Sequence, residues 1–182
     1  MTRRTQSYGF TLIELLIVVA IIGVIAAIAI PNLVRARASA NEAQAIGDTR
    51  TVMSANVAYA SSNCGYFAAE LTCMTKDGGG AICIPGYPAL APQFLAGDLG
   101  RAAPYDKSGY TRNYFADVPA PNVNAAICDP QSLLNYCYAS APSQTGLSGV
   151  RAFSGGPSGS IFQNSTGAMI ACPVPPGTAV LQ

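Results

Sequence analysis

Residues 9–31 read GFTLIELLIVVAIIGVIAAIAIP, and this stretch decides the fold. From Phe10 to Ile30 there are 21 residues with a single charge, Glu14. An α-helix of that length is about 32 Å long, close to the hydrocarbon thickness of a bilayer. The sequence therefore predicts a membrane-spanning helix over 10–30. A carboxylate inside it costs about 2.5–3.5 kcal/mol on insertion scales and needs a compensating partner.

Two simpler interpretations compete for this segment. Arg3 and Arg4 followed by an apolar run, with Ala27-Ile28-Ala29 as a cleavage site, resemble a secretory signal peptide. The apolar run is longer than such signals use, however, and Glu14 interrupts it. A plain membrane anchor explains the length but not the carboxylate. Both alternatives leave Glu14 without a role.

The segment resembles the type IV prepilin family, whose signature is a basic leader ending in Gly, then Phe-Thr-Leu-Ile-Glu and a long apolar helix. Here these are Gly9 and residues 10–14, within a similarity that extends over residues 9–45. The resemblance implies a leader peptide at 1–9, cleavage between Gly9 and Phe10 by a membrane prepilin peptidase, and methylation of the new Phe10 amine. It also implies that Glu14 pairs with the Phe10 amine of a neighbouring subunit during assembly.

The helix is expected to continue from residue 31 to residue 62 as an amphipathic second half. Pro31 removes one helical hydrogen bond, and Gly23 weakens the helix by about 1 kcal/mol relative to Ala, so both mark the softest part of the helix. Charged residues here, including Asp48, are expected to lie on a solvated face. The face that needs a partner is predicted to comprise Ala45, Ile46, Thr49, Val52, Met53, Val57, Tyr59 and Ala60.

After Ser62 the composition changes to Gly, Pro, Tyr and Cys, which indicates an extracytoplasmic globular domain over 63–182. GYTRNYFADV alternates as a strand, and LLNYCYAS, GVRAFS, GSIFQ and AMIAC are further candidate strands. We expect an α+β fold in which a small antiparallel sheet packs on the amphipathic half of the helix. The family implies the same arrangement, the pilin fold.

Six cysteines, all beyond residue 60, predict disulfides formed in an oxidising compartment. Turn-rich sequence between the partners favours Cys73–Cys83, around residues 76–80, and Cys128–Cys137. Cys64 would then join Cys172. No CxxC pair occurs, so neither a metal site nor a cofactor is predicted.

Composition argues against several classes of function. Ten Lys and Arg against nine Asp and Glu give no basic surface for nucleic acid, and the absence of His removes the usual general base. We therefore predict no catalytic residues, and a structural role is what the resemblance to the prepilin family implies. Asn164-Ser165-Thr166 fits an N-glycosylation pattern but is assigned to a turn.

The resemblance implies a type IV pilin. Such a subunit waits in the inner membrane and then polymerises with copies of itself into an extracellular filament for adhesion, twitching motility or DNA uptake. Its expected partners are the prepilin peptidase, the inner-membrane assembly machinery and minor pilins. A type II secretion pseudopilin is the nearest alternative, although the chain length and the cysteines favour the pilus. A membrane-anchored extracellular enzyme or binding module is a distant one.

Overall fold

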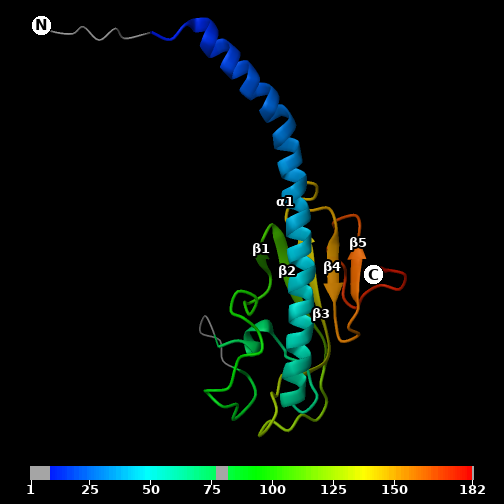
Figure 1. Ribbon diagram of the computed structural model, residues 1–182. Coiled ribbons are helices and arrows are strands. Elements are labelled where there is room, and N and C mark those ends of the chain that lie inside the picture. Colours follow the sequence, from blue (N-terminus) through cyan, green and yellow to red (C-terminus); the bar gives the residue numbers. More distant parts are fainter. Residues whose placement is uncertain (1–8, 77–81, 182) are drawn as a thin grey trace, which may run out of the picture. The chain divides into compact units, whose positions relative to one another are not determined.

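The computed structural model describes residues 9–76 and 82–181, and it divides into two compact units, Met1–Arg37 and Ala38–Gln182. Helix α1, Leu12–Ser62, contributes residues to both units, so each half is described with its own unit (Figure 1). Apart from Gly9, the predicted leader lies outside the described residues.

In the first unit, α1 presents its apolar side chains outward. Phe10 and Leu12 are 80% and 81% exposed, and the other large apolar side chains up to Leu33 are also exposed. The helix remains α-helical through Gly23 and Pro31. Among the described residues, α1 is the helix long and apolar enough to cross a membrane by length and composition.

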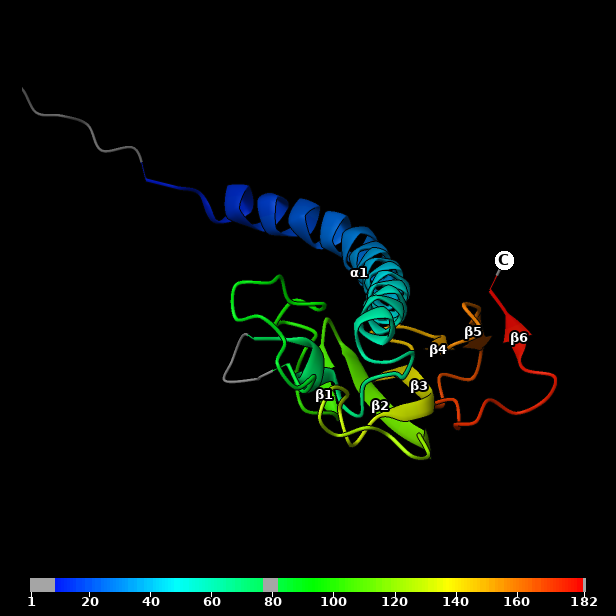
Figure 2. The same ribbon diagram turned by 90° about the horizontal axis from the view of Figure 1, so that it is seen from below.

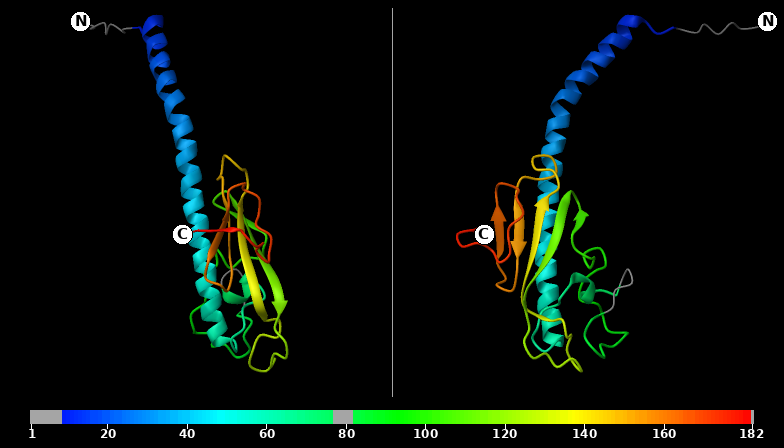
Figure 3. Two further views of the ribbon diagram at one scale, coloured as in Figure 1. Left: turned by 90° about the vertical axis from the view of Figure 1, so that its right-hand side faces the viewer. Right: turned by 180° about the vertical axis from the view of Figure 1, so that it is seen from behind.

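The second unit contains a six-stranded antiparallel sheet in the order β1-β2-β3-β4-β5-β6, which is the order of the strands in the chain. The neighbouring strands β2 and β3 are the longest, and a short 3-10 helix, η1, precedes the sheet. The bounds are η1 Leu71–Met74, β1 Tyr105–Lys107, β2 Tyr110–Pro119, β3 Leu133–Pro142, β4 Ala152–Gly155, β5 Ile161–Asn164 and β6 Ala179–Val180. Figures 2 and 3 show the second half of α1 against one face of this sheet. The expected α+β fold is confirmed.

The core of the second unit lies between α1 and the sheet. Val52 and Tyr59 of the helix pack with Tyr138 of β3, and Ala45 and Met53 belong to a second cluster of buried apolar residues. The predicted partner-facing side of the helix is wrong at one position, because Val57 is 60% exposed. The turn of the helix that places Val52 and Tyr59 against the sheet leaves Val57 on the solvent side.

The prediction of a solvated face is also wrong for Asp48, which is 5% exposed and faces the sheet. Its Oδ2 accepts a hydrogen bond from Arg112 Nη2 at 2.8 Å, and its Oδ1 accepts one from Lys107 Nζ at 3.1 Å. Lys107 also contacts Asp98 Oδ2 at 2.8 Å. A carboxylate is tolerated in this core because cations from β1 and β2 meet it there.

Glu42 makes a second polar connection between α1 and the sheet. Its Oε1 accepts the backbone N–H groups of Val150 and Arg151, at 2.8 and 3.1 Å, and its Oε2 accepts from the Arg151 guanidinium. Burial alone would raise the pKa of Glu42, but these hydrogen bonds outweigh it and hold the pKa below its ordinary value.

Three disulfides join the six cysteines, and one of them is the predicted Cys73–Cys83. The other two predicted pairs are wrong, because the chain links Cys64 to Cys128 and Cys137 to Cys172. Cys137 lies inside β3, four residues after its start at Leu133. Those extended residues carry Cys137 about 13 Å along the sheet, away from the loop that holds Cys128. A disulfide needs Cα atoms within about 7 Å, and both observed pairs have 6.0 Å.

The candidate strand AMIAC, residues 168–172, does not form. Its Cys172 is bonded to Cys137 in the middle of the sheet, and its Ile170 packs with Ala141 and Ala152. The segment is therefore attached to a face of the sheet and does not extend its edge, where β6 pairs with β5 instead. Asn164–Gly167 forms a turn, in which Asn164 Oδ1 accepts the N–H and the hydroxyl of Thr166.

Candidate assembly site at the start of the helix

The candidate site is the first turn of α1, where the single carboxylate of the apolar segment lies. The backbone N–H of Thr11 donates to Glu14 Oε2 at 3.0 Å, and the Thr11 hydroxyl donates to the same oxygen at 2.6 Å. In return, the Glu14 N–H contacts Thr11 Oγ1 at 3.3 Å. These contacts form a capping box, in which Thr and Glu three residues apart satisfy each other's free donors at a helix start.

Sequence reasoning singled out Glu14 but missed Thr11. The signal was present, because Thr11-Leu12-Ile13-Glu14 has the spacing of a capping box directly before an apolar run. The box gives Glu14 a local structural role, since the carboxylate fixes the point at which the helix begins. It also holds the carboxylate in a defined position at the start of the helix.

The capping box supplies hydrogen bonds to Glu14 but no positive charge. Its donors are neutral, and none of the ion pairs among the described residues includes Glu14. In the uncut chain the nitrogen of Phe10 is an amide, because Gly9 precedes it. A carboxylate held this way in an apolar environment still requires a cation from elsewhere.

The other predicted site residues are placed as follows. Gly9 and Phe10 are exposed and lie just before α1. Gly23 has open space where a side chain would begin, and Pro31 lies inside the helix. The weakening of the helix at these two positions stays a prediction.

A cavity of about 730 Å³ in the second unit lies beside β5 and β6, and its polar lining includes Arg151, Gln163, Ser165 and Thr178. Among the described lining residues there is no carboxylate, Lys or Cys to act as a base or nucleophile. Arg151 is itself paired with Glu42 at 2.8 Å.

Comparison with known proteins assigns a class to this N-terminal region. Residues 4–30 match the family model of the prokaryotic N-terminal methylation motif. The chain is 45% identical over 68 residues to the type IV major pilin protein PilA of Myxococcus xanthus. The aligned region covers 36% of this chain and 31% of that protein. This chain is also 68% identical over 34 residues to the type IV wide pilus major component PilA4 of Thermus thermophilus. That aligned region covers 19% of this chain and 26% of the relative.

The front of the chain is thus that of a protein with an N-terminal methylation motif. Its resemblance to the type IV pilins, predicted from residues 9–14, is confirmed by these matches. The chain spans about a third or less of the length of these curated relatives. No solved structure matches it.

Proposed function

We propose that this chain is a structural pilin subunit that is cleaved between Gly9 and Phe10, methylated on the Phe10 amine and then polymerised into an extracellular type IV pilus. One observation carries the proposal. A carboxylate is held by a capping box at the start of an exposed apolar helix, within a matched N-terminal methylation motif. The named relatives are pilus components, which supports the same role for this chain.

Cleavage would change the electrostatics of the first turn. Removal of residues 1–9 converts the Phe10 amide nitrogen into a cationic amine, four residues from Glu14. An amine on a second subunit can approach the free side of the Glu14 carboxylate while Thr11 continues to cap the helix. The cost of the carboxylate in lipid then falls when a neighbour docks, so charge pairing favours the assembled state and sets its register.

This arrangement suggests where each segment of the subunit lies before and after assembly. The apolar segment 10–30, which includes the first half of α1, spans the inner membrane before assembly and lies in the filament core afterwards. Residues 31–62 form the amphipathic half, and 63–182 form an extracytoplasmic domain. The prepilin peptidase, the inner-membrane assembly machinery and minor pilins are the proposed partners.

The test combines processing with assembly. N-terminal sequencing and intact mass of the native chain should give methylated Phe10 as the first residue. Glu14→Gln should be cleaved and inserted normally, because the cut lies before Phe10, yet yield at least tenfold fewer sheared filaments in electron micrographs. Normal filament yield from Glu14→Gln, or a native chain that retains residues 1–9 beside an active peptidase, would refute the proposal.

A pseudopilus subunit remains the alternative, and one observation separates it from a pilin. Surface fibres that contain this chain and extend beyond the cell envelope support the pilus. Fibres confined to the envelope support the pseudopilin. An N-terminus at Met1 or at Ile30 would instead indicate a plain anchor or a conventional signal peptide, as expected for an extracellular enzyme or binding module.

A further inference from the structure

Two arginines follow the apolar segment of α1 within about two helical turns. Arg35 and Arg37 both belong to the first compact unit, and both are exposed. None of the ion pairs among the described residues includes either of them. The sequence has no acidic residue between Glu14 and Glu42. The helix therefore presents two cations at this level and no nearby carboxylate of its own to pair with them.

The distance of these arginines from the apolar segment matches the headgroup layer of a bilayer. At 1.5 Å per residue, the Cα atoms of Arg35 and Arg37 lie about 8 and 11 Å beyond that of Ile30 along the helix. The polar layer on each side of the hydrocarbon is about 5–8 Å thick. Side chains of a helix lean toward its N-terminus, and a long arginine keeps its charged end among polar groups. Both guanidinium groups can therefore reach lipid phosphates.

The two side chains leave the helix on opposite sides. Successive residues are about 100° apart around the helix axis, so positions 35 and 37 are separated by about 200°. A guanidinium presents paired N–H donors that match two phosphate oxygens. Each arginine can therefore bind its own headgroup, and the helix would be held between lipids on two sides.

We propose that Arg35 and Arg37 bind the phosphates of anionic phospholipids in the extracytoplasmic leaflet and so fix the depth of α1 in the membrane. This inference rests on the proposed membrane span of residues 10–30, but not on cleavage or on filament formation. Basic residues beside a membrane are attracted to anionic lipids. Zwitterionic lipids are disfavoured, because their headgroup amine adds a second cation near each guanidinium.

The depth of the helix matters for Glu14. With Ile30 held at the outer boundary of the hydrocarbon, Glu14 lies about 24 Å further in and about 6 Å short of the inner boundary. A slide of the helix by that distance would bring the carboxylate to the inner headgroups, but it would draw Arg35 and Arg37 away from their phosphates. The arginines thus keep the carboxylate inside the hydrocarbon, where a neighbouring subunit's amine is the partner it can reach.

The first experiment uses the uncut full-length chain in phospholipid vesicles. The chain contains no tryptophan, so Leu33→Trp places a single fluorophore at an exposed position two residues before Arg35. Its quenching by spin-labelled phosphatidylglycerol is compared with its quenching by spin-labelled phosphatidylcholine at equal mole fraction. We expect phosphatidylglycerol to quench at least twofold more strongly. The difference should disappear in Arg35→Gln with Arg37→Gln.

Arg50→Gln is the matched control, because it removes the same charge from an exposed position about 30 Å beyond Ile30 and should leave the preference unchanged. No preference for phosphatidylglycerol, a preference that survives the loss of both arginines, or an equal loss in Arg50→Gln would overturn the proposal.

Salt and free phosphate identify the ligand as a lipid. An increase in NaCl from about 0.15 M to about 1 M shortens the Debye length from about 8 Å to about 3 Å and should at least halve the preference. Inorganic phosphate should act no more strongly than chloride at the same ionic strength. If inorganic phosphate abolished the preference, the arginines would form a site for free phosphate and the lipid proposal would be wrong.

The second experiment measures depth. Leu16→Trp places the fluorophore at an exposed position two residues after Glu14, and quenching by lipids brominated at different carbons locates it in the bilayer. Replacement of both arginines by Gln should move it about 6 Å toward the inner headgroups, whereas Arg50→Gln should not move it. An unchanged depth in the double variant would show that the arginines do not set the position of the helix.

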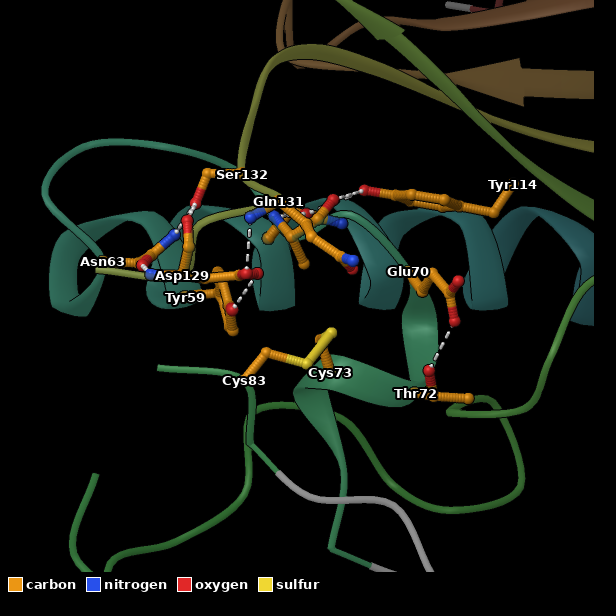
Figure 4. The surroundings of a disulfide bond; sticks show 12 residues. Tyr59, Asn63, Glu70, Thr72, Cys73, Cys83, Tyr114, Asp129, Gln131 and Ser132 are labelled. Carbon is orange, nitrogen blue, oxygen red and sulfur yellow. Dashed lines mark hydrogen bonds between the residues drawn. A yellow bond between two sulfur atoms is a disulfide. The ribbon is translucent and has the colours of Figure 1, made fainter. Parts of the chain in front are cut away.

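Near-ultraviolet circular dichroism checks that the second unit stays folded in each variant. It reports buried tyrosines such as Tyr59, whose hydroxyl donates to Asp129 at 3.0 Å beside the Cys73–Cys83 disulfide (Figure 4). The two arginines lie outside this unit, so their loss should leave the signal unchanged. Because the vesicles contain uncut chains, loss of the lipid preference would not affect the pilin proposal. Normal filaments from Glu14→Gln would equally leave the lipid preference standing.

Discussion

Replacement of Asp48 by Ala tests how the long helix is attached to its sheet. Asp48 is buried in the middle of the helix–sheet interface, where it contacts Arg112 at 2.8 Å and Lys107 at 3.1 Å. Arg112 is fully buried, and its Nε and Nη1 have no hydrogen-bond partner in the described protein. Asp48→Ala would therefore leave a buried guanidinium without its ion-pair partner.

The expected cost follows from this geometry. Loss of one partner from a buried ion pair destabilises by about 3–5 kcal/mol, because the remaining charge stays desolvated. Ala has a better helix propensity than Asp and returns up to about 0.7 kcal/mol. The net loss should be about 2–4 kcal/mol, which corresponds to a Tm lower by about 4–16 °C for a domain of this size.

Urea unfolding of the full chain in detergent, followed by the near-ultraviolet circular dichroism of its tyrosines, measures this loss with the disulfides intact. Asp98→Ala is the matched control, because that carboxylate contacts the same Lys107 but its side chain is 61% exposed. Exposed pairs contribute about 0–1 kcal/mol. The joint replacement Asp48→Leu with Arg112→Met should recover most of the stability, since no fully buried charge remains and Lys107 keeps Asp98 as its partner. Equal losses in Asp48→Ala and Asp98→Ala would refute the reasoning.

Three further predictions concern stability. Because the pKa of Glu42 in the fold lies below its ordinary 4.5, its ionised form stabilises the protein above about pH 4.5 and this contribution is lost as the pH falls through the lowered value. Urea unfolding curves at pH 7 and pH 3 measure the difference in stability between the wild type and Glu42→Gln. This difference should be smaller at pH 3, and an equal difference at both pH values would contradict the prediction. Gly47→Ala, on an open helix face, should stabilise the protein by about 0.5–1 kcal/mol. Gly156→Ala should destabilise it by about 1–3 kcal/mol, because the added Cβ would lie 2.8 Å from a backbone oxygen. Thermal melts in which both variants change the stability in the same direction would reject this prediction. Cys137→Ser with Cys172→Ser should lower stability by about 2–4 kcal/mol, and a non-reducing peptide map that links either cysteine elsewhere would exclude the pairing.

The local parts of the fold could be predicted from the sequence because their causes are local. The apolar run before Pro31 specifies the exposed helix by length alone. The alternation in residues 110–118 specifies β2, since side chains of a strand point to opposite faces in turn. Thr11 and Glu14 carry the capping box in their spacing, although only the structure drew attention to it.

Other features depend on residues distant in the chain. From the sequence alone, Asp48 is expected on a solvated face of the helix. Only the fold shows that Arg112 and Lys107 pair with it. Residues 168–172 have the composition of a strand, but their disulfide to β3 attaches them to a face of the sheet. Local turn chemistry indicated Cys73–Cys83 correctly but wrongly favoured Cys128–Cys137, and the remaining pair Cys64–Cys172 was wrong as a consequence.

By itself, then, the sequence determined the long apolar helix, the carboxylate at its start and the presence of a small sheet stabilised by disulfides. The tertiary structure alone decided which cysteines meet, which charges are buried and which segment forms the last strand. The physical reason is that periodicity and capping depend on neighbours a few residues apart. Disulfide and ion-pair formation depend instead on distances in space that are set only once β2, β3 and the second half of α1 have packed together.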